Sequence, residues 1–192
     1  MKKLALSLAI SVCVLAFSAF GVSAQGQFKI VATNKTSTAE KEMNQAASAG
    51  FRFEGVSGGE TAFGGKETVI VMSNDGNSGG RFQYKLLATQ RTSTMQKELN
   101  EAGNNGFEYR GQTVFETTFG GQEVVVILEK DTQMIKRTFE YKLLATSKTS
   151  TMQKELNEVG GGNFVFAGIT TGQTAFGGKE LVVVLKREVT QR

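Results

Sequence analysis

Residues 82–101 have the sequence FQYKLLATQRTSTMQKELNE, and residues 139–158 repeat it almost unchanged as FEYKLLATSKTSTMQKELNE. A more divergent copy, FKIVATNKTSTAEKEMN, occupies residues 28–44. A Phe-Gly-Gly segment follows each copy in the same register, 56 and then 57 residues apart, with its phenylalanine at Phe63, Phe119 and Phe176. Self-similarity of this length at a fixed period indicates a tandem repeat. We therefore expect three copies of one structural unit.

The local pattern of the second copy predicts a strand followed by a helix. Phe82, Tyr84 and Leu86 alternate along the first segment, as apolar residues do on one face of a strand. A helix is predicted to begin after Ser93, because apolar residues then recur at helical spacing. Gln96 follows three residues later, the spacing of a capping box. The other copies have the same spacing, at Ser37 with Glu40 and at Ser150 with Gln153.

Two further strands complete each unit. A Gly-Gly pair separates them and predicts a tight hairpin turn. In the second copy the last strand, residues 124–128, is apolar at consecutive positions, which is typical of a strand buried on both faces. We expect this strand to lie in the centre of the sheet. One helix covers only one face of a sheet, so the other face must pack on another unit or another chain.

The predicted fold class is α+β, with three tandem β-α-β-β units, each an antiparallel three-stranded sheet with one helix across one face. The predicted units span residues 25–73, 82–130 and 139–192. Residues 74–81 form a polar, flexible linker. Residues 131–138 form a second connector, in which Met134 and Ile135 are apolar enough to pack.

Residues 1–24 are predicted to be a secretory signal peptide. Lys2 and Lys3 precede an apolar run over residues 4–20, and small residues precede the expected cleavage site after Ala24. A membrane anchor is the weaker alternative, because the apolar run is short and no basic residues follow it. The protein is therefore expected to be exported, to the periplasm or out of the cell, with no membrane anchor after cleavage.

Composition excludes several function classes. The chain has no His, and its only cysteine, Cys13, lies in the predicted signal peptide, so no disulfide, His-ligated metal site or Ser-His-Asp triad is expected. No cofactor is expected. Removing 24 of the 192 residues leaves 168, with 20 basic and 18 acidic residues, and the net charge falls from +4 to +2. A charge this close to neutral argues against nucleic acid as a partner.

The repeated pattern resembles a family of small bacterial domains catalogued as domain of unknown function 4177. The residues that support the resemblance are the opening Phe-x-Tyr-Lys-Leu-Leu strand, the helix ending in Leu-Asn-Glu, the Gly-Phe-Glu-Tyr of residues 106–109 and the closing Val-Val-Val-Ile-Leu strand. Family members usually have Gly-Trp-Glu where this chain has Gly106-Phe107-Glu108. The resemblance implies a fold and no activity.

The first candidate binding site is the set of hairpin tips. Phe63, Phe119 and Phe176 each precede a Gly-Gly turn. Exposed aromatic residues presented three times would bind one partner with avidity. Alternatively, each ring folds back over the bare glycines or packs on the next unit.

The second candidate site is the start of each helix. A basic residue and a serine recur there, and helix N-termini bind anions; the residues are Lys35, Ser37, Arg91, Ser93, Lys148 and Ser150. The alternative is that each serine simply caps its helix.

No catalytic residues are predicted, because the repeated carboxylates Glu98 and Glu123 lie on a helix surface and beside a turn. We expect a non-enzymatic exported protein whose repeats bind an unknown protein partner or mediate self-association. A small-ligand or anion binder is the alternative.

Overall fold

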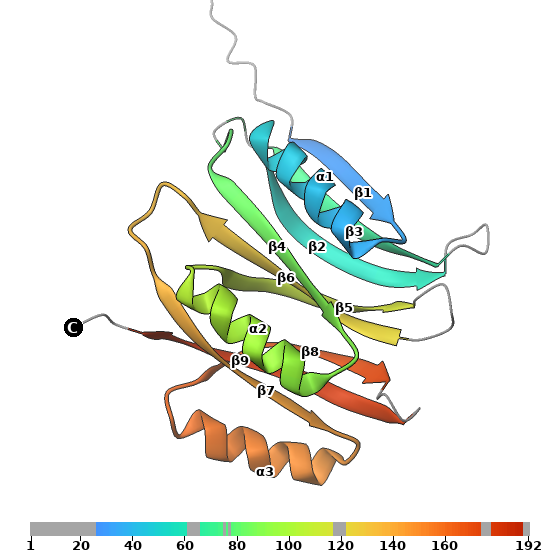
Figure 1. Cartoon of the computed structure of the whole chain (residues 1–192), viewed down its shortest axis with the longest axis vertical. Coiled ribbons are helices and arrows are strands. Elements are labelled where there is room, and N and C mark those ends of the chain that lie inside the picture. Colours follow the sequence, from blue (N-terminus) through green and yellow to red (C-terminus); the bar gives the residue numbers. More distant parts are fainter. Residues whose placement is uncertain are drawn as a thin grey trace, which may run out of the picture.

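The computed structural model describes residues 26–60, 66–74, 76, 78–116, 122–173 and 178–189. The predicted signal peptide and the three predicted tip residues, Phe63, Phe119 and Phe176, lie outside the described residues. Figure 1 shows three similar units in a row along the long axis of the molecule, with α1 near one end and α3 at the other. Within the described part of the chain, no helix has both the length and the apolar character needed to span a membrane.

Each unit contains a strand, a helix and two more strands, in that order. The first unit consists of β1 (Gln27–Thr33), α1 (Thr36–Ser48), β2 (Phe51–Glu60) and β3 (Lys66–Asn74). The second consists of β4 (Phe82–Thr89), α2 (Thr92–Asn104), β5 (Glu108–Glu116) and β6 (Gln122–Asp131). The third consists of β7 (Thr138–Thr146), α3 (Thr149–Gly160), β8 (Val165–Gln173) and β9 (Lys179–Val189).

The predicted sheet topology is confirmed. The strand orders are β1-β3-β2, β4-β6-β5 and β7-β9-β8, so the last strand of each unit is central and both pairings are antiparallel. The second strand of each unit has a register shift at the same repeat position, between Phe53 and Gly55, Tyr109 and Gly111, and Phe166 and Gly168. The chain is an α+β protein built from three tandem β-α-β-β units.

The central strands show how the units pack on one another. Residues 125–129 of β6 and 182–185 of β9 are buried without interruption, as predicted for strands covered on both faces. In β3 burial alternates, because Thr68, Ile70 and Met72 are buried while Val69 and Val71 are only half-buried. The preceding unit covers the far face of the second and third sheets. Among the described residues, nothing covers the far face of the first sheet.

The hydrophobic cores are shared between neighbouring units. One core combines Met43, Ala46 and Ile70 of the first unit with Tyr84 and Ile127 of the second. The next core joins the second and third units in the same way, with Leu99 and Val126 packed against Tyr141 and Val184. The core under α3 consists only of residues of the third unit. Each helix therefore packs on two sheets, except for α3.

Polar residues of α1 hydrogen-bond to the exposed edge of β4. The Asn44 side chain accepts a hydrogen bond from the Tyr84 N–H at 2.9 Å and donates one to the Tyr84 carbonyl at 2.9 Å. The Glu40 carboxylate accepts a hydrogen bond from the Leu86 N–H at 2.8 Å. These bonds satisfy backbone groups of an edge strand that would otherwise need water or another strand.

The same arrangement joins α2 to β7 (Figure 1). The Asn100 side chain accepts from the Tyr141 N–H at 2.8 Å. The Gln96 side chain accepts from the Leu143 N–H and donates to the Tyr141 carbonyl, both at 2.8 Å. Because Asn100 and Gln96 occupy the repeat positions of Asn44 and Glu40, the two junctions use one set of contacts.

The predicted capping boxes are wrong. The helices begin at Thr36, Thr92 and Thr149, one residue before the serine that was expected to cap each of them. Lys35, Arg91 and Lys148 take the extended N-cap geometry, and none has a side-chain cap hydrogen bond. The serines lie inside the first turn, and the expected partners Glu40 and Gln96 bind the next unit instead. A threonine two residues before each N-cap accepts its backbone N–H, at 3.2 Å in the case of Thr33 and Lys35.

The expectation that the second connector packs through its apolar residues is also wrong. Met134 and Ile135 are exposed, and Ile135 is almost fully so. Neither of these two residues belongs to a hydrophobic core of the described structure.

Gly103 marks the closest approach of α2 to β7. A Cβ atom on Gly103 would lie 2.1 Å from the Phe139 carbonyl oxygen and 2.9 Å from the Tyr141 ring. Gly160 occupies the same repeat position in α3, and a Cβ there would have no described heavy atom within 4 Å. Substitutions at these two equivalent glycines therefore distinguish two effects. A change at Gly103 affects packing on the following unit, whereas a change at Gly160 affects only the propensity of the helix itself.

We expect Gly103→Ala to lower the free energy of unfolding by about 1–3 kcal/mol, because the methyl group forces α2 away from β7. Gly160→Ala should be neutral or stabilise the protein by up to about 1 kcal/mol through helix propensity. Urea unfolding followed by circular dichroism measures both. Equal effects of the two substitutions would contradict the close packing of α2 on β7.

Candidate functional site

Each internal junction contains a buried tyrosine from the later unit. Tyr84 extends from β4 into the first unit, where its hydroxyl accepts a hydrogen bond from the Phe53 N–H at 2.8 Å and donates to Glu129 at 2.8 Å. Burial and the nearby Glu129 carboxylate raise the pKa of the Tyr84 hydroxyl, so it stays protonated and remains a donor. Tyr141 repeats the insertion, accepting from the Tyr109 N–H at 2.8 Å and donating to the Phe107 carbonyl at 2.9 Å.

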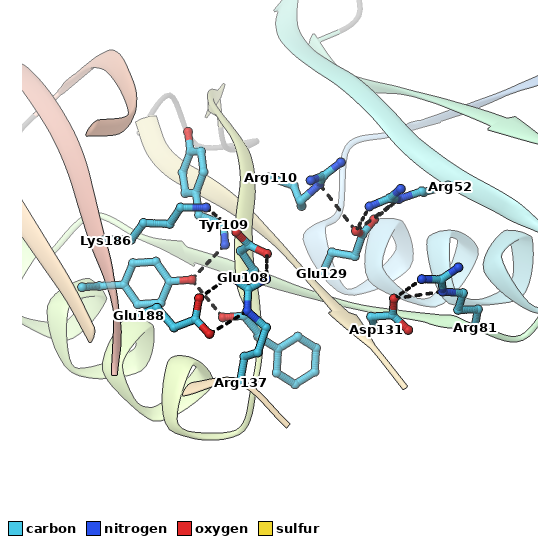
Figure 2. A network of polar contacts seen from close by, with 12 residues as sticks. Arg52, Arg81, Glu108, Tyr109, Arg110, Glu129, Asp131, Arg137, Lys186 and Glu188 are labelled. Atoms are coloured by element: carbon cyan, nitrogen blue, oxygen red, sulfur yellow. Dashed lines mark hydrogen bonds and ion pairs between the residues drawn. The ribbon is translucent and has the colours of Figure 1, made fainter. Parts of the chain in front are cut away.

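A network of charged side chains lies at the same two junctions (Figure 2). Glu129, which is buried, lies 2.9 Å from Arg52 of the first unit and 3.6 Å from Arg110. At the next junction the polarity is reversed, because Glu108 of the second unit pairs with Lys186 of the third at 2.5 Å. Arg52 and Glu108 share one repeat position, and Glu129 and Lys186 share another. An ion pair therefore crosses each junction at the same two repeat positions, with the signs of the charges exchanged.

Further ion pairs lie beside this network. Asp131 pairs with Arg81 at 2.6 Å, and the Arg81 guanidinium lowers the pKa of the Asp131 carboxyl. Arg137 lies between Glu188 at 2.5 Å and Glu108 at 3.4 Å. Contact with Arg137 lowers the pKa of Glu188. These carboxylates are held in the charged form by guanidinium groups.

An open pocket of about 480 Å³ adjoins the charged network, bordered by Arg52, Glu129, Lys130, Ile135 and Arg137 among others. Its carboxylates Glu108, Glu129 and Asp131 are all paired with basic side chains. Ion pairs of this kind hold neighbouring units in a defined arrangement. Among the described residues there is no group of three or more His, Cys, Asp or Glu that could hold a metal ion.

The six predicted anion-binding residues lie at the three helix starts. Each basic residue is the N-cap of its own helix, and each serine follows two positions later. All six side chains are exposed: Lys35, Ser37, Arg91, Ser93, Lys148 and Ser150. Each pair belongs to a different unit, so the sites are three separate ones. Anion binding at them stays a prediction.

The structure reveals two apolar surfaces that sequence reasoning missed. The N-terminal face lies on the outer side of the first sheet and consists of Phe28, Ile30, Gly55, Val69 and Val71. Ile30, Val71 and Gly55 lie directly beside one another across the three strands. The C-terminal face lies on the third unit and consists of Gln153 and Asn157 of α3 with Val165, Phe166 and Ile169 of β8.

Each face contains an aromatic residue at a repeat position that is buried in the other two copies. Phe28 is 71% exposed, whereas Tyr84 at the same position of the second unit is 3% exposed. Phe166 is 58% exposed, whereas Phe53 at the same position of the first unit is 4% exposed. A preceding unit buries the first position, and a following unit buries the second. The sequence contains a signal that could have revealed these surfaces, because an aromatic residue recurs at both of these repeat positions in all three copies.

Comparisons of this chain with models of protein families, with curated proteins and with solved structures find no match.

We expect Glu129→Gln to lower the free energy of unfolding by about 2 kcal/mol, because Arg52 and Arg110 lose a buried carboxylate partner. Glu101→Gln is the matched control, since Glu101 is exposed and its carboxylate forms a 3.8 Å surface pair with Lys97. Such pairs contribute about 0–1 kcal/mol. Denaturant unfolding of both variants tests this, and a neutral Glu129→Gln would show that the junction does not depend on the ion pair.

Proposed function

We propose that this chain is a non-enzymatic exported protein that binds protein partners through the two ends of its stack of units. The observation that supports this proposal is the exposure of Phe28 and Ile30 at one end and of Val165, Phe166 and Ile169 at the other. Large exposed apolar groups on soluble proteins usually mark interaction sites. Repeat proteins that stay monomeric normally end in units with polar outer faces.

The ion pairs around the open pocket are consistent with a non-enzymatic role. The carboxylates around the open pocket, which Figure 2 shows within the charged network, are paired with arginine or lysine. Export through the proposed signal peptide would leave a chain without cysteine, whose stability comes from packing between units. The resemblance to the domain of unknown function 4177 adds no activity to this proposal.

Binding of an anion at the helix starts is the second candidate. In all three helices the N-cap residue is basic and makes no side-chain cap hydrogen bond to the first turn, whose backbone N–H groups point out of the helix. An anion binder would melt at a higher temperature in phosphate than in chloride of equal ionic strength, and Lys35→Ala, Arg91→Ala and Lys148→Ala together would remove the difference.

The proposed function can be tested by site-specific photo-crosslinking in the source organism. A photoreactive phenylalanine analogue would replace Phe28 or Phe166, and Lys97 on the exposed side of α2 would be the control position. We expect protein adducts from the two end positions and none from position 97, because Phe28 and Phe166 belong to exposed apolar faces and Lys97 does not. Absence of adducts at both ends would contradict the proposal.

A further inference from the structure

We infer that the partner is a second copy of this chain, bound head to tail, with the C-terminal face of one copy on the N-terminal face of the next. This inference rests on the proposed function and names the partner of the same surfaces. It follows from the two internal junctions. In each of them the helix and the second strand of one unit pack on the sheet of the next unit. The two exposed faces are the unmatched halves of a third such junction.

The hydrogen-bonding groups of this third junction are present on both sides. Gln153 and Asn157 of α3 are the same residue types as Gln96 and Asn100 of α2. Both are exposed, and Gln153 donates to Asn157 at 3.2 Å in place of a strand edge. On the other side, Phe28 and Ile30 occupy the positions whose backbone groups α1 and α2 bind in the later units, and β1 is an edge strand. The side chains of α3 therefore match the open edge of β1.

The apolar groups are complementary in the same way. A Cβ on Gly111 would lie 3.0 Å from the Phe53 ring of the preceding unit, and a Cβ on Gly168 would meet the Tyr109 ring. In both junctions an aromatic ring therefore lies over a glycine. Gly55 occupies the same position in the first unit, and a Cβ there would have no described heavy atom within 4 Å. Phe166 is the exposed aromatic ring that corresponds to Phe53 and Tyr109.

Burial supports the same pairing. Val125 and Ile127 of β6 are fully buried against the first unit, whereas Val69 and Val71 at the same positions of β3 are half-buried. Docking of α3 and β8 of another copy would cover these two valines. It would also extend the core under α3, which has fewer buried residues than the two shared cores.

Two differences, the loss of an ion pair and the loss of a hydroxyl group, make the junction between copies weaker than the internal junctions. The two repeat positions that form the ion pairs Arg52–Glu129 and Glu108–Lys186 are Val165 and Ser73 at the ends of the chain, so this ion pair has no counterpart between copies. Phe28 lacks the hydroxyl with which Tyr84 and Tyr141 accept a backbone N–H. Association between copies is therefore reversible, while covalent linkage keeps the internal junctions closed.

The symmetry of the contact determines the assembly. The two faces differ, so the contact is heterologous, and each docked copy leaves one of its two faces free, so the assembly always has one free face at each of its ends. Repetition gives an open chain, or a ring if the rotation per copy closes.

The test is sedimentation velocity of purified residues 25–192, which include every described residue, over a range of concentrations. We expect concentration-dependent growth beyond the dimer. Ile30→Lys on the N-terminal face and Phe166→Lys on the C-terminal face should each raise the midpoint concentration of association at least tenfold. Ile135→Lys is the control, because Ile135 is exposed and apolar but lies on the connector, outside both faces; it should associate like the parent chain.

Mixing the two face variants identifies the geometry. Each variant keeps the face that the other has lost, so the mixture should form a one-to-one dimer and nothing larger. In the parent chain, Phe28→Tyr should lower the midpoint concentration roughly threefold to tenfold, because it supplies the missing hydroxyl to the Phe166 N–H of the other copy. Thermal melting of each variant at low concentration establishes that it is folded.

Three outcomes would overturn the inference. They are a parent chain that stays monomeric up to its solubility limit, self-association that neither face variant weakens, and face variants that do not dimerise when mixed. A monomeric parent whose end positions still crosslink to a different protein would leave the proposed function standing and reject only the second copy as partner. A monomeric parent without crosslinks would reject both.

Discussion

The structure depends on the insertion of the first strand of one unit against the helix of the unit before it. Asn44 and Asn100 hydrogen-bond to the backbone of β4 and β7. The buried hydroxyls of Tyr84 and Tyr141 accept hydrogen bonds from the backbone of β2 and β5, the second strand of the preceding unit in each case. These contacts satisfy the backbone hydrogen-bonding groups of an edge strand. They also complete a hydrophobic core that two neighbouring units share. A unit of about 50 residues is marginal alone, so this coupling is what makes each core large enough.

A junction of this kind is directional, because one side offers a helix and the other a strand edge. Three units in a row therefore form two junctions and leave one unmatched half at each end. The internal junctions have ion pairs of opposite polarity, Arg52 with Glu129 and Glu108 with Lys186, which favour the correct order of units. The end faces lack charges, so their binding depends on apolar packing and on backbone hydrogen bonds.

The sequence pattern predicted the three units, the order of their elements and the central position of the last strand, because periodicity and turn residues are local properties. It also predicted that the face of each sheet opposite its own helix must pack on another unit or another chain. The capping boxes were wrong because Ser-x-x-Gln spacing is compatible with two roles, and the partner of Gln96 lies 45 residues away at Tyr141. No local rule distinguishes a side chain that caps its own helix from one that binds another unit.

The amino-acid sequence by itself determined that this protein is a threefold repeat of one β-α-β-β unit, since repetition and hydrophobic period are properties of the chain alone. Only the tertiary structure decided which copies of a residue are buried. Phe28 and Tyr84 occupy one repeat position, yet the first is exposed and the second buried. The physical reason is that burial depends on the presence of a neighbouring unit, and among the described residues no unit covers Phe28 as the first unit covers Tyr84.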